Sequence, residues 1–230
     1  MTPAQQRKDE ANLGGIVSCL AFSPDLGGVA SGLLAAGTYE GSVGIFDSAS
    51  YQMALLLHGH RGGVTQVLWS RCGNYLYTGA RKDGDIICWD VRFQQQEVYR
   101  MDRDTKGTNQ RIQFDIEPEG RHLATGGEDG QLRVFQLSDG KPVASFPFAS
   151  DTVNGFAYHP FGPLAASSSG QRRYPNDPDR HHAHFASDES DDQLPSGSHQ
   201  GQLTGLWNAL MIWRFPFQWA GPQGGTTADS

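Results

Sequence analysis

The chain has 230 residues, of which 37% are hydrophobic and 29 are glycines. This length supports one sizeable core, and the glycine content excludes a helical bundle. The net charge is −7, but residues 176–192 hold six acids and one base and therefore carry −5 of it. The rest of the chain is close to neutral, so its charge does not exclude an anionic partner.

The lack of a secretory signal at residues 1–12 and the pattern of cysteines favour a reduced compartment. No apolar run approaches the length of a membrane span, and residues 1–12 lack the apolar core of a secretory signal. Cys19, Cys72 and Cys88 are scattered and form no CxxC pair. We therefore expect no membrane association, and an intracellular setting.

Short runs rich in β-branched and aromatic residues follow one another along the chain, separated by turns that contain Gly or Pro. After an expected linker at 1–14, strands are predicted at 16–22, 33–39, 42–47 and 53–58. The stretch from Gly59 to Asp90 opens with Gly-His, contains three such runs and closes with Trp-Asp, and a fourth run follows at 97–101. Further strands are predicted at 111–116, 122–127, 131–137, 143–148, 153–160, 163–170 and 209–217.

These runs repeat with a fixed period. The first strand of each group ends at Phe22, Trp69, Ile116 and Tyr158, giving steps of 47, 47 and 42 residues. A period of roughly 40–45 residues with Gly-His and Trp-Asp marks is typical of a WD-repeat β-propeller, in which each blade has four antiparallel strands a to d. The sequence therefore predicts an all-β fold with about four blades, at about 15–58, 59–102, 108–148 and 152–217, together forming a partial propeller at 15–219.

Two features interrupt or limit this propeller. Residues 176–201 form an acidic insert rich in Ser and His within the fourth blade, and residues 220–230 form a tail; we expect both to be disordered. The insert either shields basic residues from non-specific nucleic acid or is simply a tolerated loop. Because a propeller normally closes its ring, we interpret the chain as the carboxy-terminal part of a larger propeller and expect a ring of seven blades.

A buried polar chain is expected in the second blade. Blades pack through both faces, so polar side chains between them need partners. The candidates for this structural network are His60, Thr78, Asp83 and Trp89, and His60 is interpreted as a satisfied core histidine.

The sequence indicates no catalytic or metal site and no cofactor or small-molecule substrate. It has no GxSxG, no HExxH and no Gly-rich phosphate loop ahead of a helix. His181, His182 and His184 lie in the acidic insert, and we interpret them as solvated residues and not as metal ligands. We therefore expect a protein that is not an enzyme.

Three segments are more specific than the repeat itself. GARKDGDIICWDVR (79–92), TNQRIQFDIEPEGRHLATGG (108–127) and VNGFAYHPFGPLAASSSGQRRYP (153–175) resemble segments of the telomerase Cajal body protein family. This resemblance covers roughly residues 14–175. It implies a non-enzymatic scaffold that binds small Cajal body RNAs and telomerase RNA, works with other ribonucleoprotein or scaffold proteins, and directs these particles to Cajal bodies in the nucleus, with a cytoplasmic pool left open.

Basic residues converge on one end of the predicted blades. The d–a loops and b–c turns emerge at the same end, and they carry the candidate RNA-binding residues Arg61, Arg81, Lys82, Asn109, Gln110, Arg111, Arg172 and Arg173. Arginines and amides at one end suit phosphate and base-edge contacts with an unpaired RNA loop. The alternative is a generic WD-repeat platform for protein partners without RNA binding, in which Arg81 or Arg111 pairs with Asp83 or Asp115.

Overall fold

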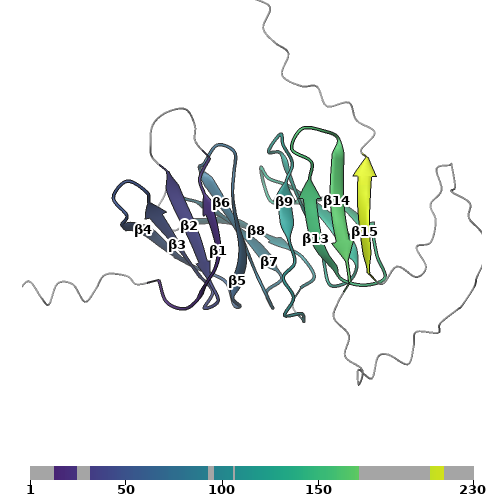
Figure 1. Cartoon of the computed structure of the whole chain (residues 1–230), viewed down its shortest axis with the longest axis horizontal. Coiled ribbons are helices and arrows are strands. Elements are labelled where there is room, and N and C mark those ends of the chain that lie inside the picture. The colour runs from purple at the N-terminus through teal and green to yellow at the C-terminus, as the bar shows by residue number, and fades with distance from the viewer. Residues whose placement is uncertain (1–12, 25–31, 93–95, 106, 171–207, 215–230) are drawn as a thin grey trace, which may run out of the picture.

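The computed structural model describes residues 13–24, 32–92, 96–105, 107–170 and 208–214. Their strands form four antiparallel sheets (Figure 1), and in each sheet the strands pair in chain order. Blade 1 contains β1 (Val17–Phe22), β2 (Leu33–Thr38), β3 (Ser42–Asp47) and β4 (Met53–His58); blade 2 contains β5 (Val64–Trp69), β6 (Tyr75–Ala80), β7 (Asp85–Asp90) and β8 (Gln96–Asp102). Blade 3 contains β9 (Phe114–Ile116), β10 (His122–Thr125), β11 (Gln131–Gln136) and β12 (Pro142–Pro147); blade 4 contains β13 (Val153–Tyr158), β14 (Leu164–Ser169) and β15 (Ala209–Arg214).

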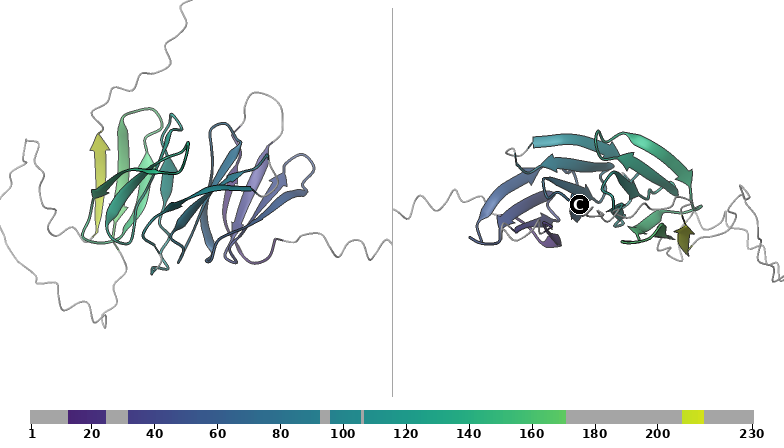
Figure 2. Two further views of the ribbon diagram at one scale, coloured as in Figure 1. Left: turned by 180° about the vertical axis from the view of Figure 1, so that it is seen from behind. Right: turned by 90° about the horizontal axis from the view of Figure 1, so that it is seen from above.

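The blades follow one another along an open arc, with blade 1 at one end and blade 4 at the other (Figure 2). This arrangement confirms the predicted all-β propeller fold. The d–a connections and b–c turns lie at the lower end of the blades in Figure 1, which we call the lower rim. The a–b and c–d connections lie at the opposite end, the upper rim.

Apolar side chains pack between consecutive blades, and these layers form the core. Between blades 1 and 2, one cluster includes Val43, Ile45, Trp69 and Trp89. Blades 2 and 3 share a second cluster, and blades 3 and 4 a third. Because side chains alternate along a strand, each sheet contributes one face to each neighbouring blade.

One strand is clearly shorter than the sequence predicts. The predicted strand 111–116 is shorter in the structure, since β9 pairs within its blade only from Phe114 to Ile116. Just before it, the Gln113 amide donates to Asn154 O of blade 4 at 2.9 Å, so the main chain there binds the next blade. Strand β15 ends at Arg214 among the described residues and pairs with all of β14 across the insert.

Several predicted features lie outside the described residues. They include linker residues 1–12, the insert 176–201 with its three histidines, and the tail 220–230. Within the part of the chain that is described, no helix has the length and apolarity needed to cross a bilayer.

Candidate nucleic-acid interface

The structure brings together the four residues of the expected polar network. His60 Nδ1 lies 2.9 Å from Asp83 Oδ2, and His60 Nε2 lies 2.7 Å from Thr78 Oγ1. The Trp89 indole donates to the same Thr78 oxygen at 2.9 Å. A neutral imidazole with its proton on Nδ1 satisfies this chain, since Trp89 donates to Thr78, Thr78 to His60 and His60 to Asp83.

Asp83 anchors the lower rim of blade 2. Burial opposes its ionisation, but hydrogen bonds from His60 and from the backbone amides of Arg61 and Asp85 outweigh burial, so the pKa of Asp83 lies below its ordinary value. The Arg61 amide donates to Asp83 Oδ2 at 3.0 Å, and the Thr105 hydroxyl donates to Asp83 O at 2.6 Å. The buried network therefore fixes the turn that carries Arg81 and Lys82.

Arg81 stacks on an aromatic ring from the preceding blade. Its guanidinium carbon lies 4.3 Å from the centre of the Tyr39 ring, and that ring is 44% exposed. A planar guanidinium on an aromatic face is a stable arrangement that still leaves hydrogen-bond donors available. Tyr39 was not among the predicted site residues; its place in the b–c turn of blade 1, at the same rim as the basic residues, was the available signal.

Lys82 and the loop before β9 continue the same surface. Lys82 is exposed and adopts a φ of 53°, the left-handed region that few non-glycine residues occupy. Its backbone amide donates to Thr108 O at 3.1 Å, and the Thr108 hydroxyl accepts from the Gln110 amide. This contact joins the b–c turn of blade 2 to the loop that holds Asn109, Gln110 and Arg111.

Arg111 is exposed, and its charge reaches blade 1. Burial raises the pKa of the Cys19 thiol in β1, and hydrogen bonds with Ser18 and the Gly37 backbone, then the positive charge of Arg111, partly offset that effect. Since Cys19 lies on the innermost strand of blade 1, Arg111 is placed near the inner side of the arc. The candidates Arg172 and Arg173 lie outside the described residues.

Basic residues at the two rims differ in their partners. On the upper rim, ion pairs join Arg92 to Asp90, Arg121 to Glu117 and Glu119, and Lys141 to Asp139. On the lower rim, no ion pair with another described residue is found for Arg61, Arg81, Lys82 or Arg111. The expected alternative in which Arg81 or Arg111 is neutralised by Asp83 or Asp115 is therefore not what the structure shows.

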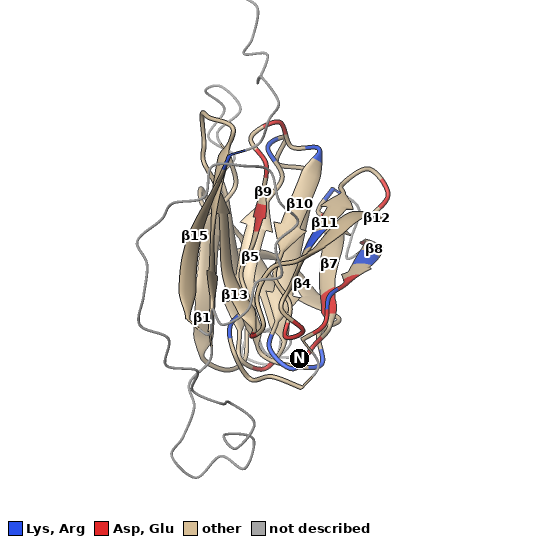
Figure 3. Cartoon of the chain, turned by 90° about the vertical axis from the view of Figure 1, so that its right-hand side faces the viewer, with Lys and Arg blue, Asp and Glu red and all other residues tan. Residues whose placement is uncertain are grey.

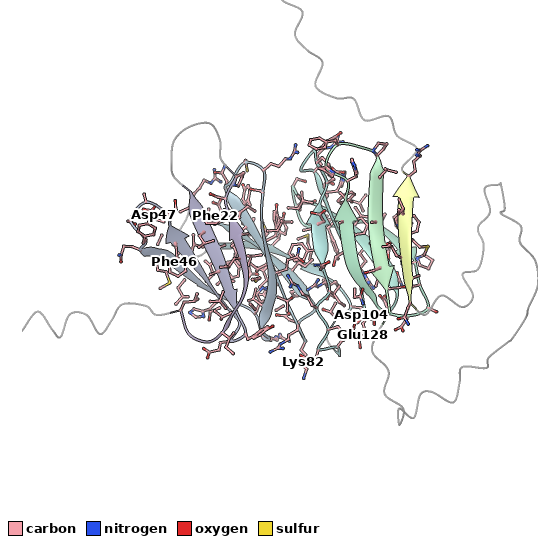
Figure 4. The ribbon with its side chains drawn as sticks, in the orientation of Figure 1. Phe22, Phe46, Asp47, Lys82, Asp104 and Glu128 are labelled. Atoms are coloured by element: carbon pink, nitrogen blue, oxygen red, sulfur yellow. The ribbon has the colours of Figure 1, made fainter. Side chains whose placement is uncertain are left out.

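Acidic residues also occur at the lower rim. Figure 4 shows Asp104 and Glu128 near each other there, apart from Lys82. The Glu128 amide donates to Asp104 O at 2.6 Å, so these two belong to the blade 3 side of the rim. Lys and Arg positions stand beside acidic positions at this end in Figure 3. At the lower rim, the basic side chains without an ion pair to another described residue thus lie over blades 1 and 2 and the loop that follows blade 2.

Blade 3 replaces the histidine network with a buried arginine that the sequence reasoning missed. Arg103 is 1% exposed, and it donates to Ile112 O at 2.9 Å and to Thr125 Oγ1 at 3.3 Å. Thr125 occupies in blade 3 the position that Thr78 occupies in blade 2. Arg103 therefore binds the hydroxyl equivalent to the one that His60 binds. Burial lowers the pKa of Arg103 to about 10, which leaves it charged at neutral pH.

A pocket lies at the upper rim. Its volume is about 240 Å³, and its lining includes Trp69, Arg71, Asp115, Glu117 and Tyr158. Burial raises the pKa of Asp115. Small-molecule pockets typically enclose roughly 300–1,000 Å³, so this one suits a single side chain of a protein partner better than a cofactor.

Metal chemistry finds no support in the described part of the chain. No group of three or more His, Cys, Asp or Glu side chains gathers there as a metal site would require. Cys19, Cys72 and Cys88 are all free thiols.

Sequence comparisons agree with this geometry. The model of the WD domain, G-beta repeat, matches residues 52–90, and that of the anaphase-promoting complex subunit 4 WD40 domain matches residues 74–160. With four antiparallel blades and a Gly-His to Trp-Asp network, the chain is a WD-repeat propeller protein.

Within this class, its relatives are the telomerase Cajal body proteins, which confirms the expected resemblance. The chain is 40% identical over 167 residues to telomerase Cajal body protein 1 of Homo sapiens, covering 70% of this chain and 29% of that protein. It is 32% identical over 200 residues to the Drosophila melanogaster homologue, covering 83% and 36%. A guanine nucleotide-binding protein negative regulator of Schizosaccharomyces pombe is 32% identical over 208 residues, covering 89% and 48%. The chain thus spans about a third of the length of its first curated relatives.

Proposed function

We propose that the chain is a non-enzymatic scaffold that binds unpaired RNA at its lower rim. The observation that carries this proposal is a set of exposed or half-exposed basic side chains that form no ion pair with the other described residues: Arg61, Arg81, Lys82 and Arg111. At the upper rim, by contrast, Arg92, Arg121 and Lys141 form ion pairs, while Arg71 has none among the described residues. Unpaired arginines beside an exposed tyrosine match the needs of phosphate contact and base stacking.

The names of the relatives indicate which classes of RNA to propose. Because they are telomerase Cajal body proteins, the RNAs proposed for this chain are small Cajal body RNAs and telomerase RNA. Unpaired loops of such RNAs expose base edges and faces that a propeller rim can contact. The chain would hold these ribonucleoproteins and direct them to nuclear Cajal bodies, together with other ribonucleoprotein or scaffold proteins.

Binding of a hairpin RNA with an unpaired loop, measured over a range of salt, tests this proposal. Arg81→Ala should weaken binding by about tenfold and reduce the slope of log affinity against log salt by about 0.7, the value for one contact with a single strand. Arg71→Ala is the matched control, because Arg71 is exposed and unpaired among the described residues but lies at the upper rim. Equal effects of the two variants would argue against a lower-rim site.

A protein-docking function is the second candidate, and the upper-rim pocket favours it. Its half-buried Asp115 beside Tyr158 and Trp69 could receive one side chain of a partner. In that case partner binding should tolerate salt and be unaffected by Arg81→Ala, and a substitution that fills the pocket should reduce it. The RNA titration above separates the two, since a protein platform shows no loop-dependent RNA binding.

A further inference from the structure

The pocket at the upper rim lies where three neighbouring blades meet. Its lining includes Trp69 at the end of β5 in blade 2, Asp115 of β9 and Glu117 just after it in blade 3, and Tyr158 at the end of β13 in blade 4. Its volume of about 240 Å³ is below the range of typical small-molecule sites, roughly 300–1,000 Å³. The pocket therefore suits one side chain, and its chemistry is set by residues that only the packing of blades brings together.

Asp115 is a half-buried carboxylate with no basic partner among the described residues. Its two oxygens accept hydrogen bonds from the backbone amides of Ile116 and Tyr158, each at 2.8 Å. Burial raises the pKa of this carboxyl, and the two amide bonds offset that effect only in part. Each carboxylate oxygen has a second lone pair and can accept one more hydrogen bond. A cation in the pocket would therefore meet a charge that lacks a counter-ion.

A second carboxylate contributes to the same negative environment. Glu117 accepts from His122 Nδ1 at 2.8 Å and lies 3.7 Å from Arg121 Nε, so its charge is partly compensated. Burial raises the pKa of the Tyr158 hydroxyl, and the charges of Glu117 and Asp115 raise it further. Both carboxylates thus act on the wall that Tyr158 forms.

Arg71 is the one basic side chain among the described residues that line the pocket, and it leaves the carboxylates unpaired. It is exposed and forms no ion pair with Asp115 or Glu117. Its stem lies along the turn between β9 and β10, because a β-carbon added at Gly120 would lie 3.7 Å from Arg71 Cδ. Its charge nevertheless opposes the entry of a second cation.

We propose that this pocket binds an arginine side chain presented by an extended segment of a protein partner. A planar guanidinium donates two parallel hydrogen bonds to a carboxylate and lies favourably on an aromatic face such as that of Tyr158. It is also more weakly hydrated than the ammonium group of lysine, which favours arginine in a half-buried site. Phe161 is 82% exposed and directly follows Pro160 of the lining, so it offers an apolar contact to the residues that flank the arginine.

This inference rests on the second candidate function, the docking of a protein partner, and names the side chain that the pocket receives. It does not depend on RNA binding, because the basic candidates for RNA lie at the lower rim. The two activities therefore call for separate ligands and separate variants.

Three blocked, fluorescently labelled peptides that differ only in their central residue test the proposal in anisotropy titrations with the 230-residue chain. The central residue is arginine, lysine or citrulline, which has nearly the shape of arginine but no charge. The arginine peptide should bind about tenfold more tightly than the citrulline peptide, because hydrogen bonds between charged groups are the stronger ones. It should also bind more tightly than the lysine peptide.

Substitutions in the lining should change arginine binding in opposite directions. Asp115→Asn should weaken the arginine peptide by about tenfold and leave the citrulline peptide nearly unchanged. Glu117→Gln should weaken it less, because Glu117 already has partners. Arg71→Ala should strengthen it, because a like charge is removed. Asp139→Asn is the matched control, since Asp139 is an upper-rim acid that pairs with Lys141 and does not line the pocket.

Each result separates the arginine site from the docking function on which it rests. Equal binding of the arginine and citrulline peptides overturns the arginine site but leaves docking at the pocket. Tighter binding of the lysine peptide overturns the choice of a guanidinium. Binding of none of the three overturns both the inference and protein docking at this pocket, without affecting RNA binding at the lower rim. The peptide comparison uses the unmodified chain, so it decides the matter even where Asp115→Asn fails to fold.

Discussion

At Asp83, hydrogen bonding and burial act in opposite directions on one carboxylate. The substitution Asp83→Asn removes the charge that orients His60. It also weakens the hydrogen bonds that the Arg61 and Asp85 amides donate to this side chain. We expect the free energy of unfolding at pH 7 to fall by about 1–3 kcal/mol. Chemical denaturation followed by tryptophan fluorescence measures this change.

The same substitution should alter the acid dependence of stability. Because the pKa of Asp83 is lowered in the folded state, its contribution is present above the unfolded value of about 3.9 and is lost as pH falls below it. The difference between Asp83→Asn and the unmodified chain should therefore shrink below about pH 4. Asp139→Asn, which changes an exposed carboxylate at the upper rim, is the control. Its free energy of unfolding should stay close to that of the unmodified chain at pH 7 and below about pH 4. A constant difference across this range would contradict the role given to the Asp83 charge.

At the scale of elements, β15 completes blade 4 from beyond the insert. The Trp213 indole donates to Ser167 Oγ at 2.8 Å, and its ring lies 4.9 Å from that of Phe148 in the preceding blade. Ser167 stands where Thr78 stands in blade 2, so this bond repeats the one between Trp89 and Thr78. One indole thereby joins strand c to strand b and blade 4 to blade 3.

Trp213→Ala should release this strand. We expect a loss of about 3 kcal/mol, the low end for removal of a tryptophan, because the ring is only partly buried. Hydrogen exchange should accelerate in β14 and β15 while β5 to β7 of blade 2 keep their protection. Arg214→Ala, an exposed position on the same strand, should change neither quantity; equal acceleration in both variants would show that Trp213 does not hold β15.

At the scale of the whole molecule, stability is distributed unevenly along the arc. Among the described residues, blades 2 and 3 pack on a neighbouring blade through both faces, whereas blades 1 and 4 each pack on a neighbouring blade through one face. Repeats that contact only their neighbours draw stability from those interfaces. In the 230-residue chain in solution, amide exchange should therefore be slowest in β5 to β7 and faster in β1 and β15. Uniform protection across the four blades would instead indicate one cooperative unit.

The repeat could be predicted from sequence because it depends on local signals. The alternation of apolar residues, the glycine turns and the 47-residue steps specify strands and blades through the geometry of the chain itself. The stretch from Gly-His to Trp-Asp, residues 59–90, was enough to select His60, Thr78, Asp83 and Trp89, since a buried polar group in a blade needs a partner. The place of the basic residues at one rim also follows from blade topology alone.

Only the tertiary structure decided which side chains meet between blades. The stacking of Arg81 on Tyr39 joins residues of different blades, and the bond from Arg103 to Thr125 joins a d–a connection to strand b. Neither pair has a sequence motif, because each depends on how two sheets pack face to face. The same packing sets burial: Val67 is 4% exposed because it packs in the cluster between blades 1 and 2, whereas Leu20 at the equivalent position of blade 1 is 61% exposed. A repeat is encoded within each blade, but exposure and charge pairing are properties of the neighbours that surround it.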